Sequence, residues 1–109
     1  MASRQETVDY ILDQIAGAGD VSARKMFGEY GLYCDGKFFG VVCDDTLFLK
    51  PTDPGRAFAG DVEEGSPYPG AKPHLIVSGD QLEDADWVSE FVRVTTAALP
   101  APKPKKKKA

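Results

Sequence analysis

The sequence predicts an α+β fold in which helices from the two ends of the chain pack in one layer on an antiparallel sheet. Apolar residues recur at helical spacing near the start of the chain and again near its end. Between them, residues 24–50 read as a meander of three short strands joined by two-residue turns. A length of 109 residues predicts one domain with one core.

The first helix is expected over about residues 4–16. Ser3 followed by Glu6 has the spacing of a capping box, in which each side chain bonds the backbone N–H of the other residue. Gly17 and Gly19 predict the end of the helix. One face of this helix is apolar and consists of Val8, Ile11, Leu12 and Ile15.

Two turn signals define the meander. Asp35-Gly36 is typical of a type I′ hairpin, since glycine tolerates the positive φ that this turn requires, and Asp44-Asp45 is expected to form the second turn. Turns of this length determine which residues lie opposite each other. The expected pairs are Leu32 with Phe39, Tyr33 with Phe38, Gly31 with Gly40, Val42 with Leu47 and Val41 with Phe48.

The pleat of these strands sorts the side chains into two faces. The first expected face holds Tyr30, Leu32, Cys34, Phe39, Val41, Cys43 and Phe48. The second holds Tyr33, Phe38, Val42, Leu47 and Leu49, with Gly31 and Gly40 between them. Both faces are therefore apolar, and one layer of helices can cover only one of them. The other face requires a second layer, a ligand or another subunit.

After the meander, a short helix is expected at about residues 53–60, with Asp53 as its cap and Pro54 in its first turn. Residues 60–72 are rich in glycine, proline and acidic residues and predict an exposed loop. A further strand is expected at residues 74–78.

A last helix is expected over about residues 85–99, with Asp84 as its cap. Its apolar stripe consists of Val88, Phe91, Val92, Thr95 and Leu99. The predicted domain thus spans residues 1–99, and residues 100–109 form a proline- and lysine-rich tail that we expect to be disordered.

Charge divides the chain into an acidic body and a basic tail. Five of the thirteen basic residues lie in the last seven positions, so the body carries eight basic and seventeen acidic residues, a net charge of −9. An acidic body repels nucleic acid, whereas a lysine tail attracts phosphate without sequence preference. The candidate nucleic-acid-binding residues are Lys103, Lys105, Lys106, Lys107 and Lys108.

Residues 25–51 resemble the TfoX N-terminal domain family, which is named for a regulator of bacterial competence. The resemblance rests on a Lys-Met-Phe-Gly-x-x-Gly motif, an aspartate-glycine hairpin and an Asp-x-Leu-x-Leu-Lys strand. The matching residues, which we interpret as mainly structural, are Lys25, Met26, Phe27, Gly28, Gly31, Asp35, Gly36, Asp45, Leu47, Leu49 and Lys50. Trp87 also stands where family members often have a tryptophan.

The resemblance implies a two-layer α+β fold similar to secretion chaperones, which commonly form dimers. It implies a regulatory module without established catalytic residues. The leading hypothesis is therefore a non-enzymatic, cytoplasmic regulatory protein that acts through protein contact, as a homodimer or with an unidentified protein partner, and that needs no cofactor, metal or membrane. The alternative is an auxiliary nucleic-acid-binding protein tethered through the lysine tail.

Two cysteines invite a disulfide or a metal site. Cys34 and Cys43 are expected on one face, roughly 20 Å apart at about 3.4 Å per residue. A disulfide requires Cα atoms within about 7 Å, so free, partly buried thiols are expected. Zinc would require further ligands, and His74 is the single histidine in the sequence.

The remaining polar groups favour structural roles. His74 lacks a neighbouring nucleophile or acid and is interpreted as a surface or edge residue. The acidic pair Asp44-Asp45 and the cluster at residues 61–64 lack the spacing of a calcium loop. Arg24 and Lys25 are expected to protect a strand edge, because charged residues there oppose aggregation.

Overall fold

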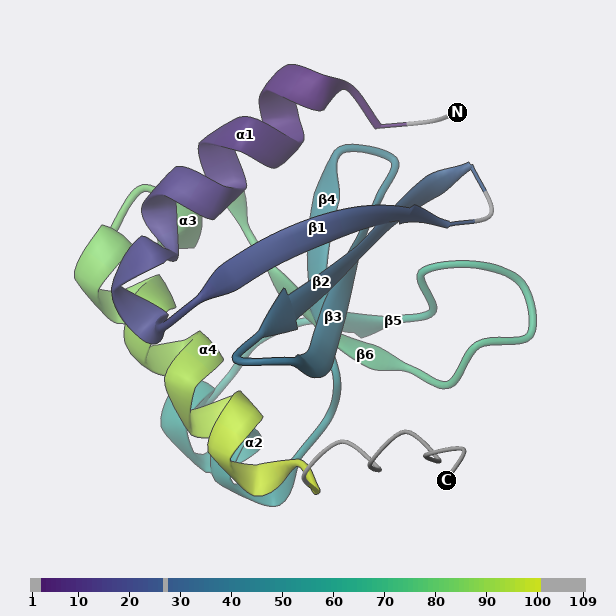
Figure 1. Ribbon diagram of the computed structural model, residues 1–109. Coiled ribbons are helices and arrows are strands. Elements are labelled where there is room, and N and C mark those ends of the chain that lie inside the picture. The colour runs from purple at the N-terminus through teal and green to yellow at the C-terminus, as the bar shows by residue number, and fades with distance from the viewer. Residues whose placement is uncertain (1–2, 27, 101–109) are drawn as a thin grey trace, which may run out of the picture.

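The computed structural model describes residues 3–26 and 28–100, and these form one sheet with helices packed on it (Figure 1). The elements in chain order are α1 (Gln5–Gln14), the 3₁₀ turn η1 (Ala16–Ala18), β1 (Val21–Met26), β2 (Glu29–Cys34), β3 (Lys37–Cys43), β4 (Thr46–Leu49), α2 (Asp53–Ala59), β5 (Glu64–Gly65), β6 (His74–Val77), α3 (Gly79–Leu82) and α4 (Ala85–Ala98). The predicted α+β class, with helices at both ends of the domain, is confirmed.

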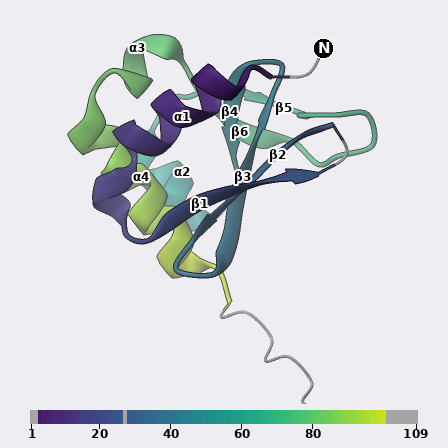
Figure 2. The same cartoon turned by 45° about the horizontal axis from the view of Figure 1, so that its top comes forward.

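The six strands lie in the order β1-β2-β3-β4-β6-β5, and every neighbouring pair is antiparallel. The predicted meander forms β2, β3 and β4. Strand β1 adds a hairpin on one side, and β6 with β5 extends the sheet on the other. The helices gather on one face of this sheet, as the two views agree (Figures 1 and 2).

The main core lies between the helices and the sheet. Its helical part includes the predicted stripes: Val8 and Ile11 of α1, and Val88, Phe91 and Val92 of α4, are each at most 1% exposed. The sheet side of this core consists of Tyr30, Leu32, Cys34, Phe39, Val42, Leu47, Leu49, Leu75 and Val77. Burial of these apolar side chains is the main force that holds α1 and α4 on the sheet.

Both predicted hairpin turns are confirmed. Asp35 has φ 52° and Gly36 has φ 84°, while Asp44 and Asp45 have φ 53° and 59°. Two successive non-glycine residues in the left-handed region are uncommon, although aspartate tolerates it better than most residues. The second turn is therefore a strained connection that contacts from the rest of the fold must stabilise.

The helix caps differ in part from the prediction. The Ser3–Glu6 capping box is wrong: Arg4 is the N-cap of α1 without a side-chain cap bond, because the Ser3 hydroxyl instead accepts a hydrogen bond from the Asp45 N–H. The cap of α2 is Thr52 rather than Asp53.

The cap of α4 is confirmed at its N-terminus, where the Asp84 carboxylate accepts a hydrogen bond from the Trp87 N–H. At the other end of α4, the Lys37 ammonium donates hydrogen bonds to the carbonyl oxygens of Thr96 and Leu99, at 3.2 and 3.0 Å. The β2–β3 hairpin thus supplies the positive charge that the last turn of α4 lacks.

The predicted register holds near the first turn and then fails. Tyr33 lies opposite Phe38 as expected, but the pairing shifts at Leu32, which lies opposite Gly40 instead of Phe39. Gly31 consequently lies opposite Val41, and the predicted contact between two glycines is wrong. An extra residue in one strand is a β-bulge, which reverses the facing of everything beyond it.

The bulge exchanges residues between the two predicted faces. Val42, Leu47 and Leu49 face the helices, whereas Val41, Cys43 and Phe48 face away from them. At Gly40, strand β3 passes close to the backbone of β4. Only glycine fits there without displacing backbone, because a Cβ at this position would lie 2.3 Å from the Phe48 carbonyl oxygen. The pairs between β3 and β4 are those expected, since both strands shift together.

Candidate functional site

The helix-free face of the sheet carries its own apolar cluster. Val41, Cys43 and Phe48 are only 6–8% exposed, and Phe38 and Ile76 pack against them. The expectation that both faces of the meander are apolar is thus confirmed, with altered membership. Since helices lie on the opposite face, something else must exclude water here.

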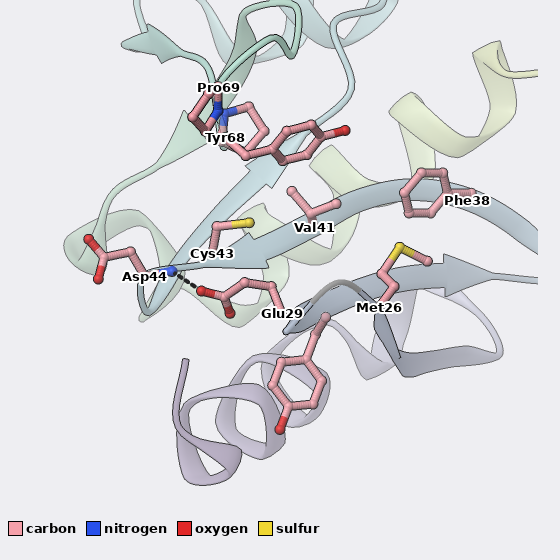
Figure 3. A pocket seen from close by; sticks show the side chains of 10 residues that line it. Met26, Glu29, Phe38, Val41, Cys43, Asp44, Tyr68 and Pro69 are labelled. Carbon is pink, nitrogen blue, oxygen red and sulfur yellow. Dashed lines mark hydrogen bonds between the residues drawn. The ribbon is translucent and has the colours of Figure 1, made fainter. Parts of the chain in front are cut away.

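A loop and a pocket occupy this face. The pocket has a volume of about 550 Å³ and lies between the central strands and the β5–β6 connection (Figure 3). Its walls are mostly apolar. They are formed by Met26, Glu29, Tyr30, Phe38, Val41, Cys43, Asp44, Pro67, Tyr68 and Pro69.

The segment from Pro67 to Pro69 forms the roof of the pocket and lies over Val41 and Cys43 (Figure 3). Two prolines restrict the backbone around Tyr68. The loop is closed on itself by hydrogen bonds from the Ala71 N–H to the Tyr68 carbonyl and from the Ser66 hydroxyl to the Ala71 carbonyl. Tyr68 remains 54% exposed, so the roof offers an aromatic ring at the mouth of the pocket.

One end of the pocket is acidic. The Glu29 carboxylate accepts a hydrogen bond from the Asp44 N–H at 2.9 Å and another from the Ser3 N–H at 2.9 Å. Desolvation opposes its charge, but these hydrogen bonds outweigh it and lower the pKa of Glu29. A fixed, ionised carboxylate therefore lies at the end of an apolar space.

The opposite end of the pocket is aromatic. Met26 and the Phe38 ring meet over Gly31, where a Cβ would lie 2.7 Å from the Met26 Cε and 3.0 Å from Phe38. A side chain at this position would displace the end of Met26, so glycine lets Met26 and Phe38 pack closely over the strand. The Lys50 ammonium lies 4.6 Å from the centre of the Phe38 ring, within the range of a cation–π contact.

The two cysteines are free and buried, as predicted, but they lie on opposite faces of the sheet rather than on one. The bulge between them causes this difference. Burial raises the pKa of the Cys34 thiol, with the Asp35 carboxylate adding to the effect. Burial, together with Glu29 and Asp44, also raises the pKa of Cys43, so both thiols are protonated at neutral pH.

The other candidate polar residues remain dispersed. His74 begins β6, with its Nδ1 2.8 Å from the Lys72 carbonyl oxygen. Over residues 3–26 and 28–100, no three histidine, cysteine, aspartate or glutamate side chains are grouped to hold a metal ion. Within the same residues, no helix has the length and apolarity needed to cross a bilayer.

The residues of the predicted family motif fall into turns, core and pocket walls. Gly28 has φ 80° in the β1–β2 connection, and Asp35 and Gly36 form the β2–β3 turn. Leu47 and Leu49 are buried under the helices. Met26 belongs to the pocket wall and packs with Phe38 over Gly31, and Lys25 and Lys50 lie over the Tyr30 and Phe38 rings. Phe27 and the five tail lysines lie outside the described residues.

Sequence reasoning missed the site itself. It treated residues 60–72 only as an exposed loop, although Pro67-Tyr68-Pro69 carries a signal for a stiff segment that presents an aromatic ring. Glu29 has no recognisable motif. Its role depends on Ser3 and Asp44, which are distant along the chain.

Comparison with known proteins gives two findings. The model of the family described as TfoX N-terminal domain matches residues 13–99. The chain is also 46% identical over 108 residues to a Spirochaeta aurantia protein described as "Uncharacterized 12.7 kDa protein in trpE 5'region". The aligned region covers 99% of this chain and 93% of that protein. Because the family model spans most of the sequence, the predicted resemblance is confirmed: the chain belongs to the TfoX N-terminal domain family.

Proposed function

We propose that this protein is a non-enzymatic regulatory module that acts through protein contact, with a second copy of the chain as its partner. Membership in a family named for a competence regulator supports a regulatory role. The observation that carries the proposal of contact is an open sheet edge. Within the described residues, β1 (Val21–Met26) pairs with β2 alone, and its outer edge is six residues long.

The positive side chains of β1 lean over the neighbouring strand and away from this edge. The Arg24 guanidinium lies 5.4 Å from the centre of the Tyr33 ring, and the Lys25 ammonium lies 6.0 Å from that of Tyr30. Arg24 and Lys25 do lie on an edge strand, as the sequence predicted. The backbone groups of that edge nevertheless stay available to another strand, which is a common mode of protein contact.

A second copy fits this edge by symmetry. In an antiparallel pairing centred on Ala23, Ala23 lies opposite Ala23 of the other copy, Ser22 opposite Arg24, and Val21 opposite Lys25. No like charges are directly opposite each other, which is the condition that favours such a pairing. The two-fold arrangement uses the same surface on both copies and closes without forming fibres.

Light scattering at micromolar concentration tests the dimer. The unmodified chain should have twice the mass of one chain. Ser22→Lys places a lysine opposite Arg24 twice per dimer, and at roughly 0.2–1 kcal/mol per pair the dimer should weaken by about tenfold.

Ala57→Lys is the matched control. It adds the same charge at an exposed position of α2, so it should leave the dimer unchanged. A monomeric unmodified chain, or equal behaviour of the two variants, would refute pairing through β1.

Several features support a role without catalysis. Both thiols have raised pKa values, and the His74 Nδ1 contacts the backbone carbonyl oxygen of Lys72 rather than a nucleophile or an acid. We also infer a reducing compartment such as the cytoplasm, since the two thiols are unpaired. The nucleic-acid alternative depended on the tail lysines, and neither the family nor the relative supports it.

A further inference from the structure

We propose that the pocket on the helix-free face binds a small organic cation, a ligand with an ammonium group on an apolar, aromatic body. The ammonium group would lie beside Glu29. The body would lie between the central strands and the Pro67–Pro69 roof (Figure 3). This proposal goes beyond the regulatory function and does not depend on the dimer.

The shape of the site favours a small molecule. A volume of about 550 Å³ lies within the range of roughly 300–1,000 Å³ that is usual for ligand pockets. Pro67 and Pro69 are apolar, Phe38 and Tyr68 are aromatic, and Val41 forms part of the floor. A pocket with such apolar walls buries the apolar body of a ligand, and the few polar groups at one end determine how the ligand is oriented.

The charge of the site favours a cation. Its lining includes Glu29 and Asp44 but neither lysine nor arginine. Glu29 is ionised and held by two backbone N–H groups. A carboxylate has about four acceptor positions, so it retains capacity for an ammonium donor.

Three positive side chains on neighbouring segments belong to other contacts. Lys50 lies over Phe38 at the far end of the pocket, Arg24 over Tyr33, and Lys25 over Tyr30. Within the described residues, neither Glu29 nor Asp44 forms an ion pair, since the acidic partners of the four ion pairs are Glu6, Asp45, Glu64 and Glu90. Across residues 1–102 the net charge of −9 adds to the attraction for a cation.

Three indoles that differ only in their head group test the site: tryptamine is cationic, tryptophol neutral and indole-3-propionate anionic. Binding is measured on the full chain by calorimetry or by shifts of backbone amide resonances. Tryptamine should bind at least fivefold more tightly than tryptophol, and indole-3-propionate should bind most weakly. The shifted resonances should belong to the pocket walls around Val41 and Tyr68.

Different variants test the contribution of the Glu29 charge and the contribution of the pocket volume to binding. Val41→Trp fills the pocket and should remove binding of all three indoles. Glu29→Gln should bring tryptamine to the affinity of tryptophol, whereas Glu83→Gln, an exposed carboxylate outside the lining, should preserve the difference. If Glu29→Gln folds poorly, Asp44→Asn is the second test. This variant keeps the backbone N–H that donates a hydrogen bond to Glu29, and it should reduce the preference for the cation.

Three results would overturn the assignment. Equal binding of the three indoles would show that charge does not select the ligand. A second variant replaces the tail lysines with glutamine, at Lys103, Lys105, Lys106, Lys107 and Lys108. If a preference for tryptamine emerges only in that variant, the tail fills the site. Much tighter binding of a short peptide containing adjacent tryptophan and lysine would assign the site to a protein segment. None of these results alters the light-scattering test of the β1 edge, so the two proposals fail separately.

Discussion

The Glu29 carboxylate accepts a hydrogen bond from the backbone N–H of Asp44 at 2.9 Å, and this contact joins the start of β2 to the turn between β3 and β4. The same carboxylate accepts from the Ser3 N–H, and the Ser3 hydroxyl accepts from the Asp45 N–H. One side chain therefore anchors the segment that precedes α1 to a turn with two residues at positive φ. It also forms the acidic end of the pocket.

Acid should weaken the fold through Glu29. Because the folded pKa of Glu29 lies below its ordinary value of 4.5, ionisation of this group favours the folded state. That contribution is complete above about pH 4.5 and is lost as the pH falls through the folded value. Glu29→Gln should therefore lower the free energy of unfolding by about 1–2 kcal/mol at pH 7, as is usual for hydrogen bonds to a charged group.

Urea denaturation of both proteins between pH 7 and pH 3 measures this effect. The difference between the unmodified chain and Glu29→Gln should shrink as the solution becomes acidic. Glu83→Gln, at an exposed position, should show no comparable change. A difference that stays constant over the whole range would contradict a contribution from the ionised carboxylate. Asp45 also has a lowered pKa, chiefly because it accepts a hydrogen bond from the Arg4 N–H, so some acid sensitivity should persist in the variant.

Alanine at Gly40 should be strongly destabilising. Its Cβ would lie 2.3 Å from the Phe48 carbonyl oxygen, so backbone must move in the middle of the sheet. We expect Gly40→Ala to lower the free energy of unfolding by about 2–3 kcal/mol, in the range of overpacked cores.

Gly79→Ala is the control for Gly40→Ala, because nothing lies within 4 Å of the added Cβ at that position. It should be neutral or slightly stabilising, since alanine restricts the unfolded chain. Thermal or urea melts compare the two variants. Equal stabilities would mean that β3 and β4 do not pass closely enough at Gly40 to exclude a methyl group.

Removal of the Lys37 ammonium should weaken the end of α4. Lys37→Met keeps most of the side-chain volume but loses two hydrogen bonds to the carbonyl oxygens of Thr96 and Leu99. A loss of about 1 kcal/mol is expected, together with faster amide hydrogen exchange in the last turn of the helix. Lys72→Met, at an exposed loop position, should change neither quantity. Unchanged exchange at Thr96 in Lys37→Met would show that the ammonium contributes nothing there.

Both thiols should react slowly in the folded protein. Burial raises the pKa values of Cys34 and Cys43, and each also lies near carboxylates. At pH 8 the reaction with a disulfide reagent should be about a hundredfold slower than in concentrated urea, because little thiolate is present and access is limited. Cys34→Ser isolates the pocket thiol, and rapid labelling of Cys43 in the folded protein would contradict its burial.

The sequence predicted the elements whose causes are local. The stripe of α1, the Asp84 cap of α4 and the Asp35-Gly36 turn each depend on residues within a few positions of one another. The apolar character of both sheet faces also followed from composition and alternation. These features were confirmed because spacing and backbone preference act before any distant contact forms.

Only the tertiary structure decided which residues occupy each face and what covers the face without helices. The bulge opposite Leu32 reverses the facing of β3 and β4, and no alternation pattern can reveal one extra residue. Ser3 bonds Asp45 and Glu29 instead of capping its own helix, across separations of 42 and 26 residues. Long-range packing overrides local preference in these cases, because a hydrogen bond or a buried contact made at a distance is stable only once the whole sheet has assembled.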